Sequence, residues 1–177
     1  MTEKNLVLLG VGHTNAHVVH EWQSRPIKGY RLVCISRFPG ATYSGMLPGT
    51  LGKQFAPSEM RIELEPFVHR AGGQLILGDV NGFNRPQRCL TFTDREPLAF
   101  DILSIGVGSM PVDWDKHASP SLVPIKPMQT FLERLDQRLA SIVARLQEPC
   151  RIAIVGGGVA GIEIALCLRQ RLQGMAR

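Results

Sequence analysis

Short apolar runs that stop at glycine alternate with a helical segment in the first part of the chain. Leu6–Leu9 leads directly into Gly10, a helical stretch then continues to Trp22, and Tyr30–Ile35 forms a second apolar run. Short apolar runs bounded by turn residues are typical of buried strands in a parallel sheet. This order predicts a β–α–β unit of about 30 residues.

The middle of the chain predicts one more helix and strand, followed by a change of rhythm. Pro66–Arg70 is predicted as a short helix and Gln74–Leu77 as a third strand. Residues 80–105 contain short runs separated by turn residues, which is typical of an antiparallel meander. Ala99–Ile105 is predicted to re-enter the parallel sheet. The segment 38–49 is rich in Gly and Pro and is predicted to be a loop without regular structure, at the ligand crevice of the sheet.

An amphipathic helix precedes the last apolar run of the chain. Its apolar residues recur at helical spacing and form one face: Met128, Phe131, Leu132, Leu135, Leu139, Ile142, Val143 and Leu146. We expect this face to pack between domains, and a helix that binds a partner or a membrane surface is the alternative. Pro149 ends the helix, and a strand over Ile152–Val155 is predicted before the next glycines.

The chain has two glycine-rich turns, one after Leu6–Leu9 and one after Ile152–Val155. Both have the pattern that binds dinucleotides. In such turns the glycines let a pyrophosphate approach the backbone, and the following helix offers N–H groups and the positive end of its dipole. Two turns of this kind, each behind an apolar strand, predict two dinucleotides side by side, as in flavoproteins that pass a hydride from a nicotinamide to a flavin. The residues are Gly10, Gly12, His13, Thr14 and Asn15 in the first turn, and Gly156, Gly158 and Gly161 in the second.

Two positions of the first unit depart from this pattern. Asn15 stands at the usual third glycine, so either the helix packs more loosely on its strand or the Asn15 amide joins the phosphate contacts. Ser36 and Arg37 stand where an acidic residue would hold a ribose. A Ser hydroxyl can hydrogen-bond a ribose, and Arg37 can stack on adenine or meet a phosphate. The departure weakens an NAD assignment for the first site.

Composition and charge narrow the class of protein. The chain has 177 residues, 44% of them hydrophobic, and a net charge of +5. Its Lys and Arg residues are dispersed, which favours solvated faces over a nucleic-acid partner. The sequence has no apolar run of about 18–20 residues that would cross a bilayer and no secretory signal, so we expect no transmembrane segment and a cytoplasmic protein.

Cysteine and histidine spacing predicts neither a redox dithiol nor a metal site. The four cysteines are scattered without a C-x-x-C pair: Cys34, Cys89, Cys150 and Cys167. His13, His17 and His20 share a helical face but lack the glutamate of H-E-x-x-H. We therefore expect no metal, and His13 is interpreted as a phosphate neighbour.

The order of these motifs resembles the FAD-dependent pyridine nucleotide–disulfide oxidoreductase superfamily, in its branch without a redox disulfide, which includes type II NADH dehydrogenases. The segment Tyr43–Gly49, Y-S-G-M-L-P-G, is similar to the NADH dehydrogenase-like flavoprotein domain sometimes fused to selenide, water dikinase. The fold class expected is α/β: a Rossmann-like FAD/NAD(P)-binding fold with a parallel sheet and an antiparallel β-meander, followed by the start of a second Rossmann unit.

The resemblance implies roles for particular residues. The first glycine turn would hold the FAD pyrophosphate and the second would bind NAD(P)H. Glu163 would be the acid near the nicotinamide–flavin junction, or else a helix-start residue that suits the helix dipole. The other implied FAD contacts are Ser44, Gly45, Met46 and Leu47 against the isoalloxazine, Val80 at the adenine, and Gly108 and Ser109 after the last strand.

The domain boundaries expected are residues 1–110 for the FAD-binding domain, 111–149 for a linker with the amphipathic helix, and 150–177 for the start of a truncated NAD(P)-binding domain. Two hypotheses follow: an FAD-dependent NAD(P)H oxidoreductase with an unknown electron acceptor, or a truncated, non-catalytic dinucleotide-binding module. A homo-oligomer and a fused C-terminal domain are left open as partners.

Overall fold

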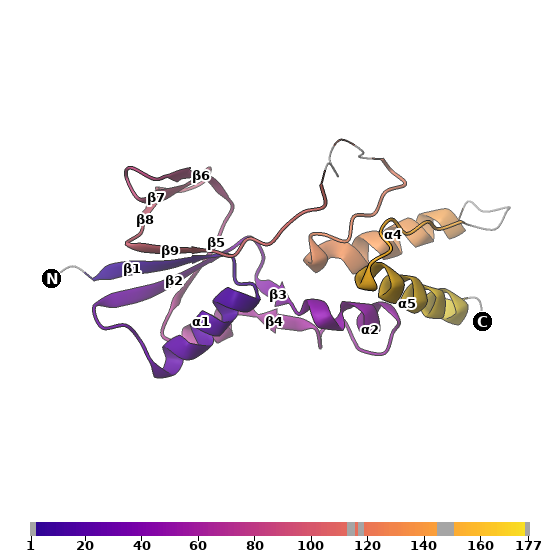
Figure 1. Cartoon of the computed structure of the whole chain (residues 1–177), viewed down its shortest axis with the longest axis horizontal. Coiled ribbons are helices and arrows are strands. Elements are labelled where there is room, and N and C mark those ends of the chain that lie inside the picture. Colours follow the sequence, from indigo (N-terminus) through magenta and orange to yellow (C-terminus); the bar gives the residue numbers. More distant parts are fainter. Residues whose placement is uncertain (1–2, 113–115, 117–118, 145–150, 176–177) are drawn as a thin grey trace. The chain divides into compact units, whose positions relative to one another are not determined.

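The computed structural model describes residues 3–112, 116, 119–144 and 151–175. The chain forms two compact units (Figure 1). The first unit comprises Met1–Ala41 and Ile62–Ser109, and the second comprises Thr42–Arg61 and Met110–Arg177.

A four-stranded parallel sheet is the centre of the first unit. Its strands are β1 (Lys4–Leu9), β2 (Tyr30–Ser36), β5 (Gln74–Leu77) and β9 (Ile102–Ile105), in the spatial order β5-β2-β1-β9. β1 pairs with β2 on one side, Leu6 opposite Leu32, and with β9 on the other, Leu6 opposite Ile102. The strand order reverses at β1, which is the point where doubly wound sheets bind ligands. The predicted parallel sheet is confirmed.

Alternate residues of the central strands face two different layers. Leu8 and Cys34 pack with α1 (His13–Ser24) and α3 (Leu64–Arg70) on one face of the sheet. Val7 and Ile35 pack on the other face against the antiparallel meander of β6 (Val80–Asn84), β7 (Cys89–Phe92) and β8 (Leu98–Ala99) (Figure 1). Because strand side chains alternate with a period of two, an unbroken apolar run is needed to fill both layers. The predicted meander is confirmed.

The segment predicted as an irregular loop contains regular structure. β3 (Gly40–Thr42) pairs with β4 (Arg61–Glu63), and η1 (Ser44–Met46) leads into the short helix α2 (Leu47–Leu51). Proline is accepted in the first turn of a helix, where its missing N–H costs nothing, and Pro48 lies there. Leu47 and Leu51 are buried, so apolar burial stabilises a helix that the Gly and Pro content argued against.

Helices form the second unit. η2 (Met128–Thr130) leads into α4 (Phe131–Val143), and α5 (Val159–Met175) follows later in the chain. The predicted amphipathic face is confirmed over α4: Phe131, Leu135 and Leu139 share one core cluster with residues of α2 and α5. Arg171 of α5 donates to the Leu51 carbonyl and pairs with Asp136 of α4, which ties the three helices together. Leu146, Pro149 and Cys150 lie outside the described residues.

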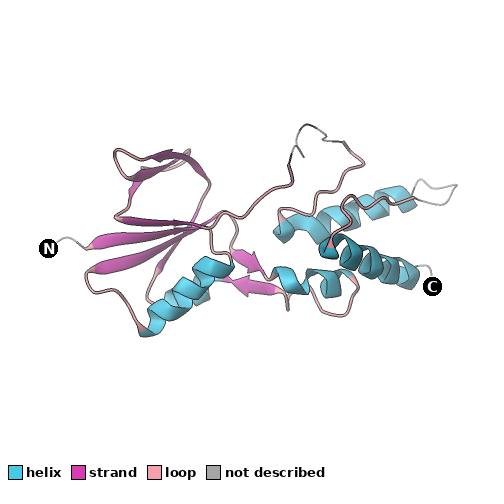
Figure 2. Cartoon of the chain, in the orientation of Figure 1, coloured by secondary structure: helices cyan, strands magenta, loops and turns pink. Residues whose placement is uncertain are grey.

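The strand predicted over Ile152–Val155 does not form. Residues 151–157 have no regular secondary structure and precede α5 as a loop (Figure 2). An extended segment becomes a β-strand only by exchanging backbone hydrogen bonds with a neighbour, and in the described part of the chain no strand pairs with it. The helical half of the predicted second Rossmann unit is thus present in the structure without its strand.

Candidate dinucleotide-binding sites

The first glycine turn lies where the carboxyl ends of three strands meet. The Gly10 N–H donates to the Ile35 carbonyl at 2.8 Å, and the Gly106 N–H donates to the Leu9 carbonyl at 2.7 Å. Gly10 has φ +82°, and a Cβ atom there would lie 2.4 Å from the Gly106 oxygen. Only glycine accepts both this backbone conformation and this close approach.

Gly12, at the start of α1, is not packed tightly against its neighbours. Its φ is −82°, and a Cβ atom there would meet the Gly106 oxygen at 3.6 Å, an ordinary contact. Within the described structure, no side chain caps the N-terminus of α1. His13 and Thr14 are exposed at this end of the helix. A helix N-terminus attracts anions through its amide groups and its dipole.

Asn15, at the position of the usual third glycine, is buried with 1% of its surface exposed. Its Nδ2 donates to the Gly10 carbonyl at 2.6 Å, and its Oδ1 accepts from the Ser104 hydroxyl at 2.7 Å. The side-chain amide therefore braces the turn against β9. One N–H of the side-chain amide and its oxygen are thus used inside the protein, and the expectation that this amide joins the phosphate contacts stays a prediction.

Ser36 and Arg37, at the end of β2, both have partners within the protein. The Ser36 hydroxyl donates to the Phe38 carbonyl at 2.7 Å and accepts the Phe38 N–H at 3.2 Å. The Arg37 guanidinium forms an ion pair with Asp79, and both side chains are 64% exposed. Exposed ion pairs of this kind contribute little to stability, and both side chains are accessible to a ligand at the end of β2.

The remaining predicted FAD contacts of the first unit lie at strand ends. Val80 is half-buried and begins β6, where it packs against the core beneath the meander. Gly108 and Ser109 follow β9 and are exposed, and Gly108 has a positive φ of +77°. The structure brings these residues into the same unit as the first glycine turn.

The predicted isoalloxazine contacts belong to the second unit. Ser44, Gly45 and Met46 form η1, and the Leu47 N–H donates to the Ser44 carbonyl. Gly45 is exposed, whereas Leu47 is only 3% exposed and belongs to the core of α2, α4 and α5. The Leu47 side chain therefore faces the core, and only its backbone is left to meet a ligand.

The second glycine turn also lies in the second unit. Gly156 has φ +116°, and a Cβ atom on Gly161 would lie 1.9 Å from the Gly156 oxygen. This contact is the close packing that the third glycine of such a turn allows. The Gly158 carbonyl accepts the Ile162 N–H at 3.1 Å, and Glu163 is exposed on α5.

Two residues that support the first turn were not identified as site residues from the sequence. Ser104 and Gly106 hold Asn15 and Gly10, and a Cβ atom on Gly106 would lie 2.7 Å from Asn15 Nδ2. The sequence signal for Gly106 was its position directly after an apolar strand. No motif singles out Ser104.

Cysteine and metal chemistry find no support in the described structure. Burial raises the pKa of the Cys34 thiol to about 12, which keeps it protonated and unreactive near neutral pH. Cys89 and Cys167 are also free. Among the described residues, no three His, Cys, Asp or Glu side chains are grouped to hold a metal ion. No helix in that part of the chain is long and apolar enough to cross a membrane.

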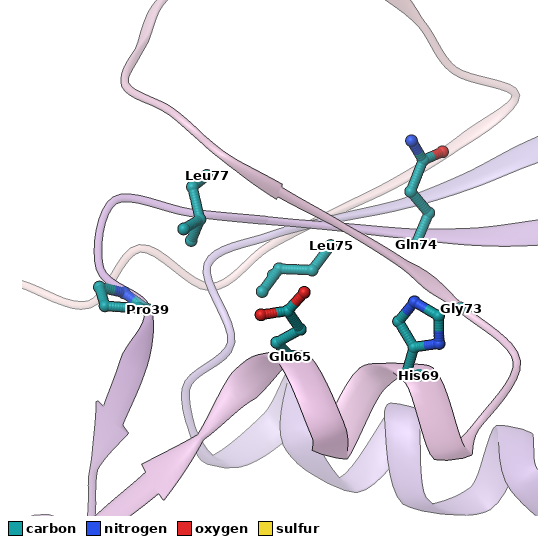
Figure 3. A pocket seen from close by; sticks show the side chains of 7 residues that line it. All are labelled: Pro39, Glu65, His69, Gly73, Gln74, Leu75 and Leu77. Carbon is teal, nitrogen blue, oxygen red and sulfur yellow. The ribbon is translucent and has the colours of Figure 1, made fainter.

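A hollow of about 430 Å³ lies between α3 and β5 (Figure 3). Glu65 and His69 come from α3, Pro39 from the loop after β2, and Leu75 and Leu77 from β5. None of its lining residues was predicted as a site residue. Its mixed apolar and polar lining does not identify a ligand.

Comparison with known proteins agrees with this geometry. No family model matches the chain. NADH dehydrogenase-like protein YutJ of Bacillus subtilis is 27% identical over 94% of this chain, and the chain spans 45% of that protein's length. NDH2 of Plasmodium falciparum, solved in complex with NADH, superimposes with a TM-score of 0.71 at 16% identity, over 98% of this chain and 38% of that one. The water-forming NADH oxidase of Lactobacillus brevis, solved with NADH bound, gives 0.70 at 16% identity, over 94% and 37%.

These likenesses establish the fold. The chain has the Rossmann-like α/β architecture of FAD/NAD-binding oxidoreductases, and its sequence is similar to that of an NADH dehydrogenase-like protein. The chain spans less than half the length of the curated relative that it matches.

Proposed function

We propose that the first unit binds FAD and that the chain functions as the front part of an FAD-dependent NAD(P)H oxidoreductase of the NADH dehydrogenase-like kind. The observation that carries this proposal is the turn at Gly10. It lies at the strand-order reversal of a parallel sheet, its backbone is packed closely against Gly106, and no side chain caps the helix that follows within the described structure. The similarity to an NADH dehydrogenase-like protein supports the oxidoreductase class.

The residues present fit a pyrophosphate. A Cβ atom on Gly12 would make one ordinary contact, with the Gly106 oxygen, beside a helix start without a side-chain cap, and this arrangement suits a diphosphate. In this proposal Gly10 and Gly12 let the diphosphate approach the backbone, and the N-terminal turn of α1, at His13 and Thr14, balances its charge. Asn15 positions the turn through its side chain and contributes to binding through its backbone.

The other FAD contacts proposed are Val80 at the adenine and Gly108 and Ser109 after β9. The backbone of Ser44, Gly45, Met46 and Leu47 is proposed to meet the isoalloxazine. A bound flavin supplies hydride acceptance from a nicotinamide and electron transfer onward to an acceptor. The protein's own part is to bind and orient, so no side chain is required as a nucleophile.

For the nicotinamide dinucleotide we propose the second glycine turn, at Gly156, Gly158 and Gly161, with Glu163 near the reacting ring. The domain assignment is proposed as 1–110 for FAD, 111–149 for the linker and amphipathic helix, and 150–177 for the start of the NAD(P) domain. The cytoplasmic location, a homo-oligomer and a fused C-terminal domain stay predictions, and the electron acceptor is unknown.

One observation favours the second hypothesis, a non-catalytic dinucleotide-binding module. Residues 151–157 form no strand in the described structure, so the second glycine turn lacks the sheet that positions the first. In that case the chain binds FAD without accepting a hydride. Bleaching of the bound flavin by NADH separates the two hypotheses.

The test is the visible absorption spectrum of the 177-residue chain after incubation with FAD and desalting. We expect the wild type to retain flavin and Gly12→Val to lose it, because the valine side chain would take the place of the proposed diphosphate, while its Cβ atom makes only an ordinary contact inside the protein. Gly174→Val is the control, because its side chain enters open space far along α5. Retention by Gly12→Val, or no retention by the wild type, would contradict the FAD assignment.

A further inference from the structure

Beyond the carboxyl ends of β2 and β5, a hydrogen-bond donor, Arg37, lies beside an acceptor, Asp79. We propose that Asp79, beyond β5, is the carboxylate that accepts hydrogen bonds from the adenosine ribose hydroxyls of the dinucleotide at the first glycine turn, and that Arg37 positions it. This inference rests on the proposed function, since it assigns the ribose end of the same site.

Strand pairing places Asp79 beside the end of β2. Ser36 is paired with Leu77 in the parallel ladder, and the Gly78 N–H donates to the Ser36 carbonyl at 3.0 Å. Just beyond these strand ends, the Arg37 guanidinium contacts Asp79 Oδ2. The end of β2 is where a ribose-binding carboxylate is expected in this fold, and the neighbouring strand supplies one there.

Neither Ser36 nor Arg37, at the end of β2, can accept hydrogen bonds from both ribose hydroxyls. A ribose diol offers two O–H donors and needs an acceptor. The Ser36 hydroxyl already donates to the Phe38 carbonyl and accepts a hydrogen bond from the Phe38 N–H. Arg37 has no acceptor atom at all. An ionised carboxylate has about four acceptor sites, so the contact of Asp79 Oδ2 with Arg37 leaves room for both hydroxyls.

The charges near Arg37 and Asp79 favour a ribose without a 2′-phosphate. Arg95 donates to the Leu77 carbonyl at 2.8 Å and lies over the Phe92 ring at 5.4 Å, and its charge is balanced by Asp94. The hydrogen bond from Arg95 lowers the pKa of Asp94. Both arginines near these strand ends are therefore paired with carboxylates, and a 2′-phosphate would face the negative charge of Asp79. The ligand class is a dinucleotide with a free 2′-hydroxyl.

The experiment is calorimetric titration of the whole chain with ADP and with 2′-deoxy-ADP, which differ only in that hydroxyl. We expect the wild type to bind ADP about tenfold more tightly, the effect of one charge-assisted hydrogen bond. Asp79→Ala should bring this ratio close to one, and Arg37→Ala should lower it partly. Glu21→Ala, which removes another exposed carboxylate paired with an arginine, Arg25, at the far end of α1, should keep the full ratio.

The outcomes separate this inference from the proposed function. If the wild type binds both nucleotides equally, or if Asp79→Ala keeps the tenfold ratio, Asp79 does not hold the ribose and the dinucleotide site itself stands. If the wild type binds neither nucleotide, the proposed function fails and this inference fails with it.

Discussion

The two glycine-rich turns of this chain have similar sequences but different surroundings. The first follows β1, which has a parallel neighbour on each side, and its tightest contact is with Gly106 of a distant loop. The second begins within residues 151–157, which pair with no strand in the described structure. Its tightest contact is local, between Gly156 and Gly161. A glycine motif becomes a rigid site only when a sheet holds the turn on both sides.

This difference predicts that equivalent substitutions will have unequal effects. In the first turn, a new side chain pushes against backbone that three strands hold. In the second turn, the backbone in contact with the new atom belongs to a loop that can shift.

The largest effect is expected for Gly10→Ala. Its positive φ costs about 1 kcal/mol for a residue with a Cβ atom, and the overlap with the Gly106 oxygen adds about 1–3 kcal/mol. Gly29→Ala is the matched control, because its φ is +80° but nothing lies within 4 Å of the new atom. Urea unfolding, followed by Trp22 fluorescence in a Trp114→Phe background, should show a loss of about 2–4 kcal/mol for Gly10→Ala and about 1 kcal/mol for Gly29→Ala. Equal losses would mean that the Gly106 contact does not constrain the turn.

A smaller loss is expected for Asn15→Ala. This change leaves the part-buried Gly10 carbonyl and Ser104 hydroxyl without their partner, and an unsatisfied buried polar group costs about 1–3 kcal/mol. The double variant with Ser104→Ala should cost less than the sum of the two single variants, because it removes both partners of one hydrogen bond. Strict additivity in the same unfolding assay would show that Asn15 and Ser104 do not interact.

The smallest effect is expected for Gly161→Ala, although its overlap is closer than that at Gly10. The Gly156 oxygen lies only 1.9 Å from the added atom, but the loop that carries it has no sheet to resist a shift. We expect a change of less than about 1 kcal/mol, since alanine also favours the helix. Gly174→Ala, with open space around it on the same helix, isolates that helix preference. A loss at Gly161 as large as that at Gly10, measured by far-ultraviolet circular dichroism, would show that the second turn is held as firmly as the first.

Much of the first unit could be predicted from apolar patterning. The runs at Leu6–Leu9 and Tyr30–Ile35 are apolar on both faces, which is the demand of a strand covered on both sides. The helix over residues 128–143 was equally readable, because its apolar residues fall on one face. Segment 38–49 was misjudged, because local glycine and proline content outweighed the burial of Leu47 and Leu51, which only the packing of α2, α4 and α5 reveals.

Some residues of the candidate site could likewise be predicted from the sequence, and others could not. Spacing alone singled out Gly10 and Gly161, where close backbone approach demands glycine. The roles predicted for Gly12, Gly156 and Gly158 do not rest on such contacts and stay predictions. The inward role of Asn15 was not predictable, because its partner Ser104 lies 89 residues away in sequence. The pairing of Arg37 with Asp79 is hidden for the same reason, since a strand ladder brings the two residues together.

The sequence by itself determined which segments are apolar, where the turns fall and which helix face is buried, because these depend on local side-chain chemistry. The tertiary structure decided which apolar segment became a strand. Leu6–Leu9 found parallel partners and Ile152–Val155 did not. The physical reason is that a strand's backbone N–H and C=O groups are satisfied by a neighbouring strand, and no residue within the segment can supply that neighbour.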